Sequence, residues 1–421
     1  MPDNGNKIPL WNKRHPYPTA DGSFIQSWLV DSWSIDRWQD ELNILKEADM
    51  NYLILAPTVI DERGKKSQAI YPSDLPGISL MKGHEKTLDN CLKAAESLGL
   101  KVFIGLNDDR HWWQLSEADK EWFVAEMHKG NAIAKELYEL YKARYPETFY
   151  GWYWVWEISN LHIKLPKYQI MLAQALNIQL DFLSNLDNSM PLMLCPFMIE
   201  KEGTPLSAYE AWSNFFSHAH FRKGDIFCPQ DAVGAGWLRM DTFVDWFEAM
   251  KKACDQVEGL RFWSDVETFR QKDWTSSTLN RFVEQLKLPS HLVDNYVTFA
   301  YSHYFSPYIV PKGYHQVYLH YLQTGKLPTN KVKPPTGLSI KKCHNKVTLS
   351  WQKQDIQDIC GYLIYANNKF ISRLQPKPDP TLKFTLDNSF SHDNSLEETT
   401  TYQIIAYDYA GNMSEPVYMK I

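Results

Sequence analysis

Long hydrophobic runs are missing from this sequence, and so is any excess of basic charge. No apolar stretch approaches the roughly 20 residues that a membrane-spanning helix needs, and the formal net charge is -6. These features predict no membrane insertion and no nucleic-acid partner. The opening segment MPDNGNKIPLWNKRHPYP has no basic stretch followed by an apolar core, so no signal peptide is visible. The sequence names neither a compartment nor an oligomeric state.

Several motifs that carry chemistry are also missing. No GxGxxG follows the first predicted strand, which argues against a nucleotide-binding sheet. GxSxG is absent, so serine-hydrolase chemistry has no support. HExxH and DxDxDG are absent too, so we predict no metal and no cofactor. Six cysteines without ligand spacing are predicted to be mostly free core thiols: Cys91, Cys195, Cys228, Cys254, Cys343 and Cys360.

Aromatic residues, by contrast, are abundant. The chain has 16 Trp, 23 Tyr and 20 Phe among 421 residues. Most of these side chains are explained by packing in a core, but tryptophan also stacks on flat apolar partners such as the face of a sugar ring. A chain of this length is too long for one ordinary core, so two domains are expected.

Short apolar runs alternate with longer amphipathic stretches from Ser23 onward. The predicted strands are Phe24–Trp28, Tyr52–Ala56, Lys101–Leu106, Tyr150–Val155, Pro191–Cys195, Ile226–Pro229, Leu260–Asp265 and Tyr296–Ala300. The predicted helices are Ile35–Ala48, which Ser34 caps, Leu88–Leu98, Glu117–Arg144, Tyr168–Leu186, Ser207–His218, Phe243–Val257, Ser277–Leu286 and Tyr314–Gln323. Eight such repeats predict an α/β fold, a (β/α)8 TIM barrel over residues 23–323 after a lead-in of residues 1–22.

The composition changes after the last of these helices. Residues 324–335, with the segment GKLPTNKVKPP, are predicted to be a polar linker. Short β patterns follow at Thr336–Lys341, Lys346–Trp351, Gly361–Ala366, Lys383–Leu386 and Thr401–Tyr407. Strands with regular turn signals and no helix predict a β-sandwich over residues 336–421.

The C-terminal segments resemble a known family. PPTGLSIKKCHNKVTLSWQ, GYLIYANNKFISR and TTYQIIAYDYAGNMSEP are similar to a fibronectin type III domain, whose core Trp and late-strand Tyr match Trp351 and Tyr402. The resemblance implies a spacer or support rather than a catalytic module. It also favours a secreted or cell-surface setting.

Two carboxylates follow predicted strands at positions where packing of the strand does not require an acidic residue. Active sites of (β/α)8 barrels lie at the carboxyl ends of the strands, where Glu157 follows GWYWVW and Glu267 follows RFWSDV. Glycoside hydrolysis uses two such groups, one protonated and one ionised. Nearby tryptophans would keep one acid protonated; they are Trp152, Trp154, Trp156 and Trp263. Capping of a helix or pairing with Arg is the alternative for either Glu alone.

Other polar and aromatic residues fall at the same predicted mouth. The candidate substrate-binding residues are Asn107, Asp108, Trp112, Trp113, Trp156, Asn160, Asp231, Trp263, Tyr301 and His303. Asp108 and Asp109 bind sugar hydroxyls or cap the third helix. Trp112 and Trp113 stack on a sugar or pack under their loop. His111 and His303 contact substrate or have a structural role.

The barrel segment resembles a second family. SFIQSWLVDSWSIDRWQDELNILKEADMNYLIL, GWYWVWEISN and FWSDVETF are similar to segments of the family of unknown function DUF4434, grouped with TIM-barrel glycoside hydrolases. The arrangement is also similar to the clan of retaining glycosidases with acids on strands four and seven. That resemblance implies Glu157 as acid/base and Glu267 as nucleophile. The clan has Asn before the acid/base, whereas this chain has Trp156, so Asn160 or Asn107 takes that part or the mechanism differs.

The sequence therefore predicts a glycoside hydrolase of retaining type that acts on an oligo- or polysaccharide. A carbohydrate-binding barrel without catalysis is the first alternative, and a metal-dependent hydrolase or deacetylase is the second. A carbohydrate is the partner in the first two cases.

Overall fold

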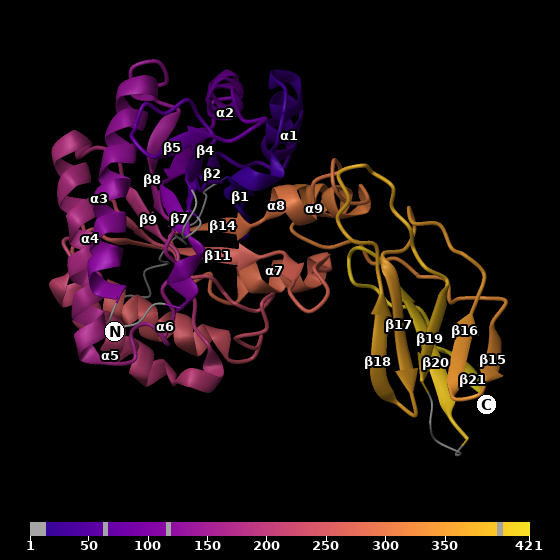
Figure 1. Cartoon of the computed structure of the whole chain (residues 1–421). Coiled ribbons are helices and arrows are strands. Elements are labelled where there is room, and N and C mark those ends of the chain that lie inside the picture. The colour runs from indigo at the N-terminus through magenta and orange to yellow at the C-terminus, as the bar shows by residue number, and fades with distance from the viewer. Residues whose placement is uncertain (1–13, 62–65, 115–118, 394–398) are drawn as a thin grey trace. The chain divides into compact units, whose positions relative to one another are not determined.

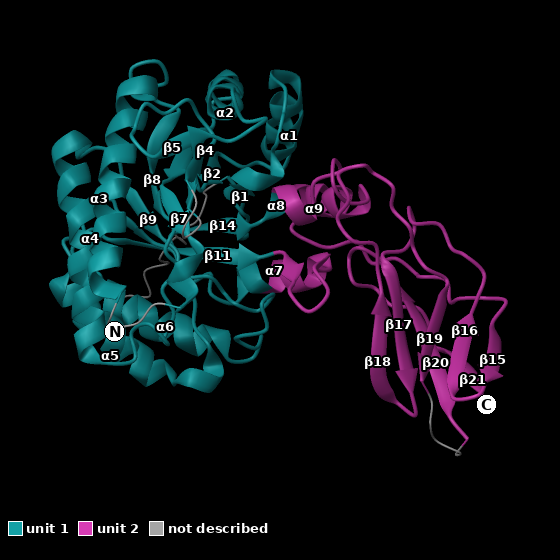
Figure 2. Cartoon of the chain, in the orientation of Figure 1, with its two compact units in different colours: residues 1–267, 285–301 teal, residues 268–284, 302–421 magenta. Residues whose placement is uncertain are grey.

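The structure is a computed structural model that describes residues 14–61, 66–114, 119–393 and 399–421. Contacts between Cα atoms divide the chain into two compact units. The first comprises residues 1–267 and 285–301, and the second comprises residues 268–284 and 302–421 (Figure 2). The domain limits expected from composition stay a prediction.

Eight parallel strands form a closed barrel in the first unit (Figure 1). They are β1 (Gly22–Gln26), β2 (Tyr52–Ala56), β6 (Lys101–Gly105), β8 (Phe149–Trp154), β9 (Leu192–Leu194), β10 (Ile226–Phe227), β11 (Arg261–Glu267) and β14 (Asn295–Phe299). Each strand pairs with its neighbour in chain order, and β14 closes the ring on β1. The predicted eight-stranded parallel barrel is confirmed.

Helices alternate with these strands. They are α1 (Ile35–Glu47), α2 (Thr87–Ser97), α3 (Lys120–Leu137), α4 (Pro166–Asp187), α5 (Pro205–His218), α6 (Phe243–Cys254), α7 (Leu279–Lys287), α8 (Tyr301–Tyr304) and α9 (Gly313–Thr324). Consecutive helices pack on one another from α3 to α6, and α1 packs on α2. The predicted cap is present, since the Ser34 hydroxyl accepts the Arg37 N–H at 3.2 Å.

The third predicted helix differs in detail. Residues 117–118 lie outside the described part of the chain, and α3 ends at Leu137 rather than at Arg144. A π-helical turn, Tyr138–Lys142, continues the chain from there. The wider turn shifts the hydrogen bonds by one residue, a change that hydrophobic spacing over five residues does not reveal.

Short strands that the sequence did not predict extend past two of the barrel strands. A four-stranded sheet contains β3 (Val59–Asp61), β4 (Ser67–Ala69), β5 (Ile78–Leu80) and β7 (Asn107–Asp109). β3 follows β2 and β7 follows β6, and these two short strands pair in parallel. This pairing fixes the position of the Asn107–Asp109 segment. A separate hairpin joins β12 (Phe269–Arg270) to β13 (Thr275–Ser276).

Alternate residues of each strand fill the barrel interior. The same alternation decides which side chains at the strand ends face the mouth. Members of this cluster are Phe24, Ile54, Ala56, Phe103, Tyr153, Met193, Cys195, Ile226, Cys228, Trp263, Val297 and Ala300. Because successive side chains of a strand point to opposite faces, the residues between them point outward to the helices. No helix in the described residues combines the length and apolarity that crossing a membrane requires.

Two antiparallel sheets lie in the second unit. One contains β15 (Ser339–Cys343), β16 (Lys346–Ser350) and β19 (Ser389–Asp393), and the other contains β17 (Gly361–Ala366), β18 (Lys369–Leu374), β20 (Thr401–Tyr407) and β21 (Val417–Lys420). Leu349 and Trp351 share one hydrophobic core with Tyr362, Ile404 and other residues of the second sheet. The two sheets therefore bury a common core.

The strand predictions in this region need correction. The predicted strand Lys383–Leu386 is wrong, because Leu386 enters the core from a segment without a strand ladder. The strands β18, β19 and β21 were not predicted. All six cysteines are free thiols, and five of them are buried as the prediction of mostly free core thiols requires, whereas Cys343 is exposed.

Candidate active site

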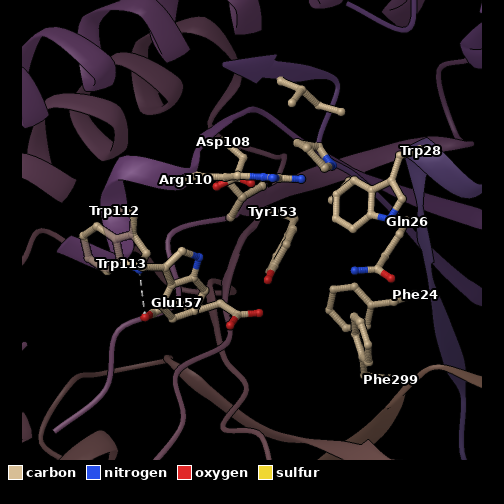
Figure 3. Close-up of a pocket in the computed structure, with 14 residues that line it drawn as sticks. Phe24, Gln26, Trp28, Asp108, Arg110, Trp112, Trp113, Tyr153, Glu157 and Phe299 are labelled. Atoms are coloured by element: carbon tan, nitrogen blue, oxygen red, sulfur yellow. Dashed lines mark hydrogen bonds between the residues drawn. The ribbon is translucent and has the colours of Figure 1, made fainter. Parts of the chain in front are cut away.

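A cavity of about 410 Å³ opens at the carboxyl ends of the barrel strands (Figure 3). Its walls come from β1, β2, β8, β14 and the segments that follow β2 and β6. The lining residues are Phe24, Gln26, Trp28, Ala56, Pro57, Ile60, Asp108, Arg110, Trp112, Trp113, Tyr153, Val155, Glu157 and Phe299. Barrel enzymes carry their chemistry at this end. Four of the predicted site residues line the cavity, namely Asp108, Trp112, Trp113 and Glu157.

Glu157 reaches the cavity because of the parity of β8. Tyr153 belongs to the barrel interior, and Val155 and Glu157 continue its face into the cavity wall. In Figure 3 the Glu157 carboxylate and the Tyr153 hydroxyl both point into the open space. The backbone is held as well, since the Trp112 indole N–H donates to the Glu157 carbonyl at 3.2 Å.

The carboxyl of Glu157 is set up to hold a proton near neutral pH. Burial raises its pKa to about 7, the charge of Asp108 adds to the rise, and a hydrogen bond with Gln230 opposes it. No cation of the described residues forms a salt bridge with Glu157. A carboxyl of this kind is protonated and ionised in comparable amounts near pH 7.

Asp108 shares the cavity with Glu157. Burial first, then the charges of Asp109 and Asp61, raise the pKa of Asp108 to about 6, and Arg110 works against this rise. Its neighbour Asp109 has a local role, because one carboxylate oxygen of Asp109 accepts the His111 N–H at 2.8 Å. The cavity therefore holds two carboxyl groups with raised pKa values, and the charge of Asp108 contributes to the rise at Glu157.

Glu267 has a different environment. Its side chain is buried, with 2% exposure, and it is not among the described residues that line the cavity. One carboxylate oxygen accepts the Ala235 N–H at 2.7 Å. The structure thus places the two predicted catalytic glutamates at the ends of β8 and β11, but in unequal surroundings.

Asp231 fixes the loop that covers Glu267. Its carboxylate is fully buried and accepts the N–H of Val233 at 3.0 Å and the N–H of Glu267 at 3.3 Å. The Gln285 amide donates to the same carboxylate at 2.5 Å. These contacts give Asp231 a structural position behind Glu267, away from the cavity lining.

Asp265 is affected by the charges of both glutamates, and the sequence analysis did not select it as a site residue. It lies on the interior face of β11 with 1% exposure. Burial and then the charges of Glu267, Asp231 and Glu157 raise the pKa of Asp265 well above its usual range. Its Oδ1 has no hydrogen-bond partner among the described residues. The signal in the sequence was a charged residue inside an otherwise buried strand.

The tryptophans expected to surround Glu157 lie mostly on the opposite face of β8. Trp152 and Trp154 are buried outside the barrel interior, and Trp156 packs edge-on against Trp112 at 5.7 Å between ring centroids. Trp263 is in the interior, edge-on to Tyr52 at 5.2 Å. None of the four lines the cavity.

The remaining candidates also lie outside the cavity lining. The Asn107 amide donates to Glu126 Oε2 at 2.8 Å, and Asn160 makes two hydrogen bonds with the backbone of Ile199. Tyr301 is fully buried, with its N–H bonded to the Thr298 hydroxyl at 3.1 Å. In the second unit, burial lowers the pKa of His303 to about 4. Their substrate contacts stay a prediction.

Histidine and acidic residues of the described chain do not gather into a metal site. His111 pairs with Asp119 at 2.8 Å. Across the residues that the structure describes, no group of three or more His, Cys, Asp or Glu side chains could hold a metal ion. Sequence reasoning missed the cavity residues Gln26, Trp28 and Arg110, because their convergence depends on the closing of the barrel.

The barrel and its mouth define the class of this protein, a (β/α)8 barrel of the kind seen in glycoside hydrolases. A candidate alpha-L-fucosidase from Bacteroides thetaiotaomicron has a similar structure, with a TM-score of 0.57, 20% identity, and coverage of 69% of this chain and 88% of that chain. At this identity the similarity shows the fold alone. The family model named Domain of unknown function (DUF4434) matches residues 20–310. The chain belongs to that family, as its resemblance indicated.

Two other solved structures are more distant. A beta-xylosidase from Caulobacter crescentus aligns with a TM-score of 0.43 and 12% identity over 83% of this chain and 82% of that chain. A beta-glucuronidase from Bacteroides uniformis gives 0.42 and 8% over 96% of this chain and 46% of that chain. These scores carry no argument about function. No curated protein sequence matches the chain.

Proposed function

We propose that the protein is a glycoside hydrolase that acts on an oligo- or polysaccharide, with Glu157 as its general acid and base. One observation carries the proposal: Glu157 lines a cavity at the barrel mouth and its pKa is raised to about 7. A general acid works best when its pKa lies near the working pH. Aromatic walls and a few polar groups, the usual make-up of a ligand site, surround it.

Glu267 is the proposed nucleophile. In a retaining reaction the carboxylate attacks the anomeric carbon while Glu157 gives its proton to the leaving oxygen. Water then attacks the glycosyl ester, Glu157 takes the proton of that water, and Glu267 leaves as a carboxylate. The position of Glu267 at the end of β11 supports this role, as does the influence of Glu157 and Glu267 on the same neighbour, Asp265. Asp108 is the rival second carboxylate, because it shares the cavity.

A barrel that binds carbohydrate without cleaving it is the second candidate. The burial of Glu267 and its hydrogen bond to the Ala235 N–H favour this candidate, since a nucleophile must reach the sugar. It predicts binding without turnover. The metal-dependent alternative predicts loss of activity in a chelator, whereas the carboxylate mechanism predicts none.

The deciding experiment is a screen of nitrophenyl glycosides and soluble plant and animal glycans. Wild type is compared with Glu157→Gln, Glu267→Gln and Asp108→Asn, and Glu258→Gln, an exposed position, is the control. We expect Glu157→Gln to lower kcat by about 10²- to 10⁴-fold with the fold intact by circular dichroism. Full activity in Glu157→Gln would exclude the proposed acid. Activity that survives Glu267→Gln but not Asp108→Asn would reassign the second carboxylate, and the product anomer, read by NMR, separates retention from inversion.

We infer that the two C-terminal sheets form a fibronectin type III-like sandwich that supports the barrel. The shared core that includes Trp351 and Tyr402 supports this fold, as do the three- and four-stranded sheets. The module is proposed to be non-catalytic. Expression of residues 324–421 alone would test it, because a sandwich with its own core gives a cooperative unfolding transition.

A further inference from the structure

Two tryptophans at the barrel mouth are exposed although most others in the described chain are buried. Trp28 is 46% exposed and Trp113 is 56% exposed, whereas the adjacent Trp112 is 1% exposed. A single exposed aromatic side chain is ordinary. Here both exposed rings line the same cavity, and Figure 3 shows them on opposite sides of it, with Glu157 beside Trp113.

Both tryptophans lie on short turns that directly follow strands. Trp28 lies on the 3-10 turn η1 (Ser27–Leu29) directly after β1, and Trp113 lies on η2 (Arg110–Gln114) after β7. The buried Trp112 anchors the second turn. Its ring stacks on His162 at 4.5 Å and its indole N–H donates to the Glu157 carbonyl. The turn that carries Trp113 is therefore hydrogen-bonded, through the adjacent Trp112, to the backbone of Glu157.

Polar groups line the same cavity as the two exposed tryptophan rings, which we call the platforms. Gln26, Asp108, Arg110 and Glu157 all line the cavity, and in Figure 3 the Gln26 amide faces the open space. Flat apolar walls with hydrogen-bonding groups between them match the chemistry of a pyranose, which has an apolar C–H face and a rim of hydroxyls. A purely apolar ligand would leave the polar groups without partners, which costs binding energy.

We propose that a linear glycan lies across the barrel mouth, with one sugar on Trp28, another on Trp113 and the bond to be cleaved at Glu157. This inference rests on the proposed function, since it takes Glu157 as the point of cleavage. The leaving group is then itself a saccharide. The glycosidic C–O bond breaks, the leaving oxygen takes the Glu157 proton, and water supplies the new hydroxyl of the other product. The substrate class is an oligo- or polysaccharide with a sugar on each side of the bond.

The test measures binding in Glu157→Gln, which removes turnover. Isothermal titration calorimetry uses cello-, xylo-, manno- and chito-oligosaccharides of one to six units. We expect one series to bind more tightly with length. Trp28→Ala and Trp113→Ala, each added to Glu157→Gln, should then weaken binding of the longer members by about five- to tenfold. Trp237→Ala, which removes another exposed tryptophan of the barrel unit that is not among the cavity lining, is the matched control.

The outcomes separate this inference from the proposed function. If binding grows with glycan length and depends on both cavity tryptophans, but wild type does not cleave the bound glycan, the proposed binding site is supported and the proposed hydrolase activity is wrong. Cleavage by wild type with kcat/KM unchanged in Trp28→Ala and Trp113→Ala keeps the hydrolase and overturns the platforms. Equal losses in Trp237→Ala, or no binding in any series, also overturn them.

Discussion

Asp265 and Glu267 lie two residues apart on the same face of β11, and the charge of Glu267 raises the pKa of Asp265. Asp265 is buried, one of its oxygens has no partner among the described residues, and Glu157 and Asp231 add further negative charge. An ionised Asp265 would face three carboxylates at once. The folded state therefore favours the protonated form of Asp265.

This relationship predicts that Asp265→Asn stabilises the protein at neutral and higher pH. A carboxyl whose pKa is raised on folding costs stability as the pH rises above the unfolded-state pKa of about 3.9. Asparagine has the shape of the protonated acid without that cost. We expect a gain of about 1–3 kcal/mol in the free energy of unfolding at pH 8, and a smaller gain at pH 4, by urea denaturation. A loss of stability at pH 8 would show that the ionised form is favoured.

Asp108→Asn is predicted to move the alkaline limb of the activity profile. The charge of Asp108 raises the pKa of Glu157, so its removal lowers that pKa and the acid loses its proton at a lower pH. The limb in kcat/KM against pH should shift down by about half a pH unit. Asp40→Asn, at an exposed position of α1, removes the same charge far from this interaction and is the control. An upward shift would contradict the assigned coupling.

Asp231→Ala is predicted to destabilise the barrel unit. The substitution removes the acceptor of the Val233 and Glu267 N–H groups and one of the two acceptors of the Gln285 amide, which also donates to the Glu267 carbonyl. Unsatisfied buried donors cost about 1–3 kcal/mol each, so we expect a loss of about 3 kcal/mol or more by chemical denaturation. Asp379→Ala is the control. It removes a carboxylate that accepts from the Thr381 N–H and hydroxyl in a similar turn at a more exposed site. Equal losses in the two variants would argue against a special role for burial at Asp231.

The barrel could be predicted because its signals are local. Strand-length apolar runs and helix-length amphipathic stretches repeat along the chain, and each of the eight predicted strands overlaps an observed one. The position of Glu157 at a strand end also follows from local pattern. The sequence did not reveal which face of GWYWVW points inward, because strands of a parallel barrel are buried on both faces and lack alternation. Trp152, Trp154 and Trp156 were therefore placed near Glu157, whereas Tyr153 and Val155 share its face.

The rest of the site depends on contacts distant in sequence. Gln26, Asp108 and Glu157 meet only when β1, β7 and β8 take their places around the mouth. The Glu267 carboxylate accepts the Ala235 N–H, which a loop after β10 supplies. The spacing of residues along the chain reveals neither the meeting of the cavity residues nor the contact of Glu267 with Ala235. A local pattern can therefore indicate the carboxylates but not their surroundings.

Asp225 provides a test that separates the stability of the barrel from its chemistry. It is 1% exposed at the amino end of β10, and its carboxylate accepts from the Leu192 N–H at 2.8 Å and from the Arg222 guanidinium at 2.7 Å. Removing one partner of a buried ion pair costs about 3–5 kcal/mol, so Asp225→Ala should lower the free energy of unfolding by that amount. Asp181→Ala, which breaks an exposed pair with His220, should cost at most about 1 kcal/mol.

Residues at the amino ends of barrel strands contribute to stability, whereas catalysis takes place at the carboxyl ends. The folded fraction of Asp225→Ala should therefore keep its KM for any glycan that wild type cleaves. Urea denaturation and kinetics at 15 °C measure the two quantities on the same preparation. A changed KM with unchanged stability would mean that this end of the barrel communicates with the mouth, and the separation of the two ends would be wrong for this protein.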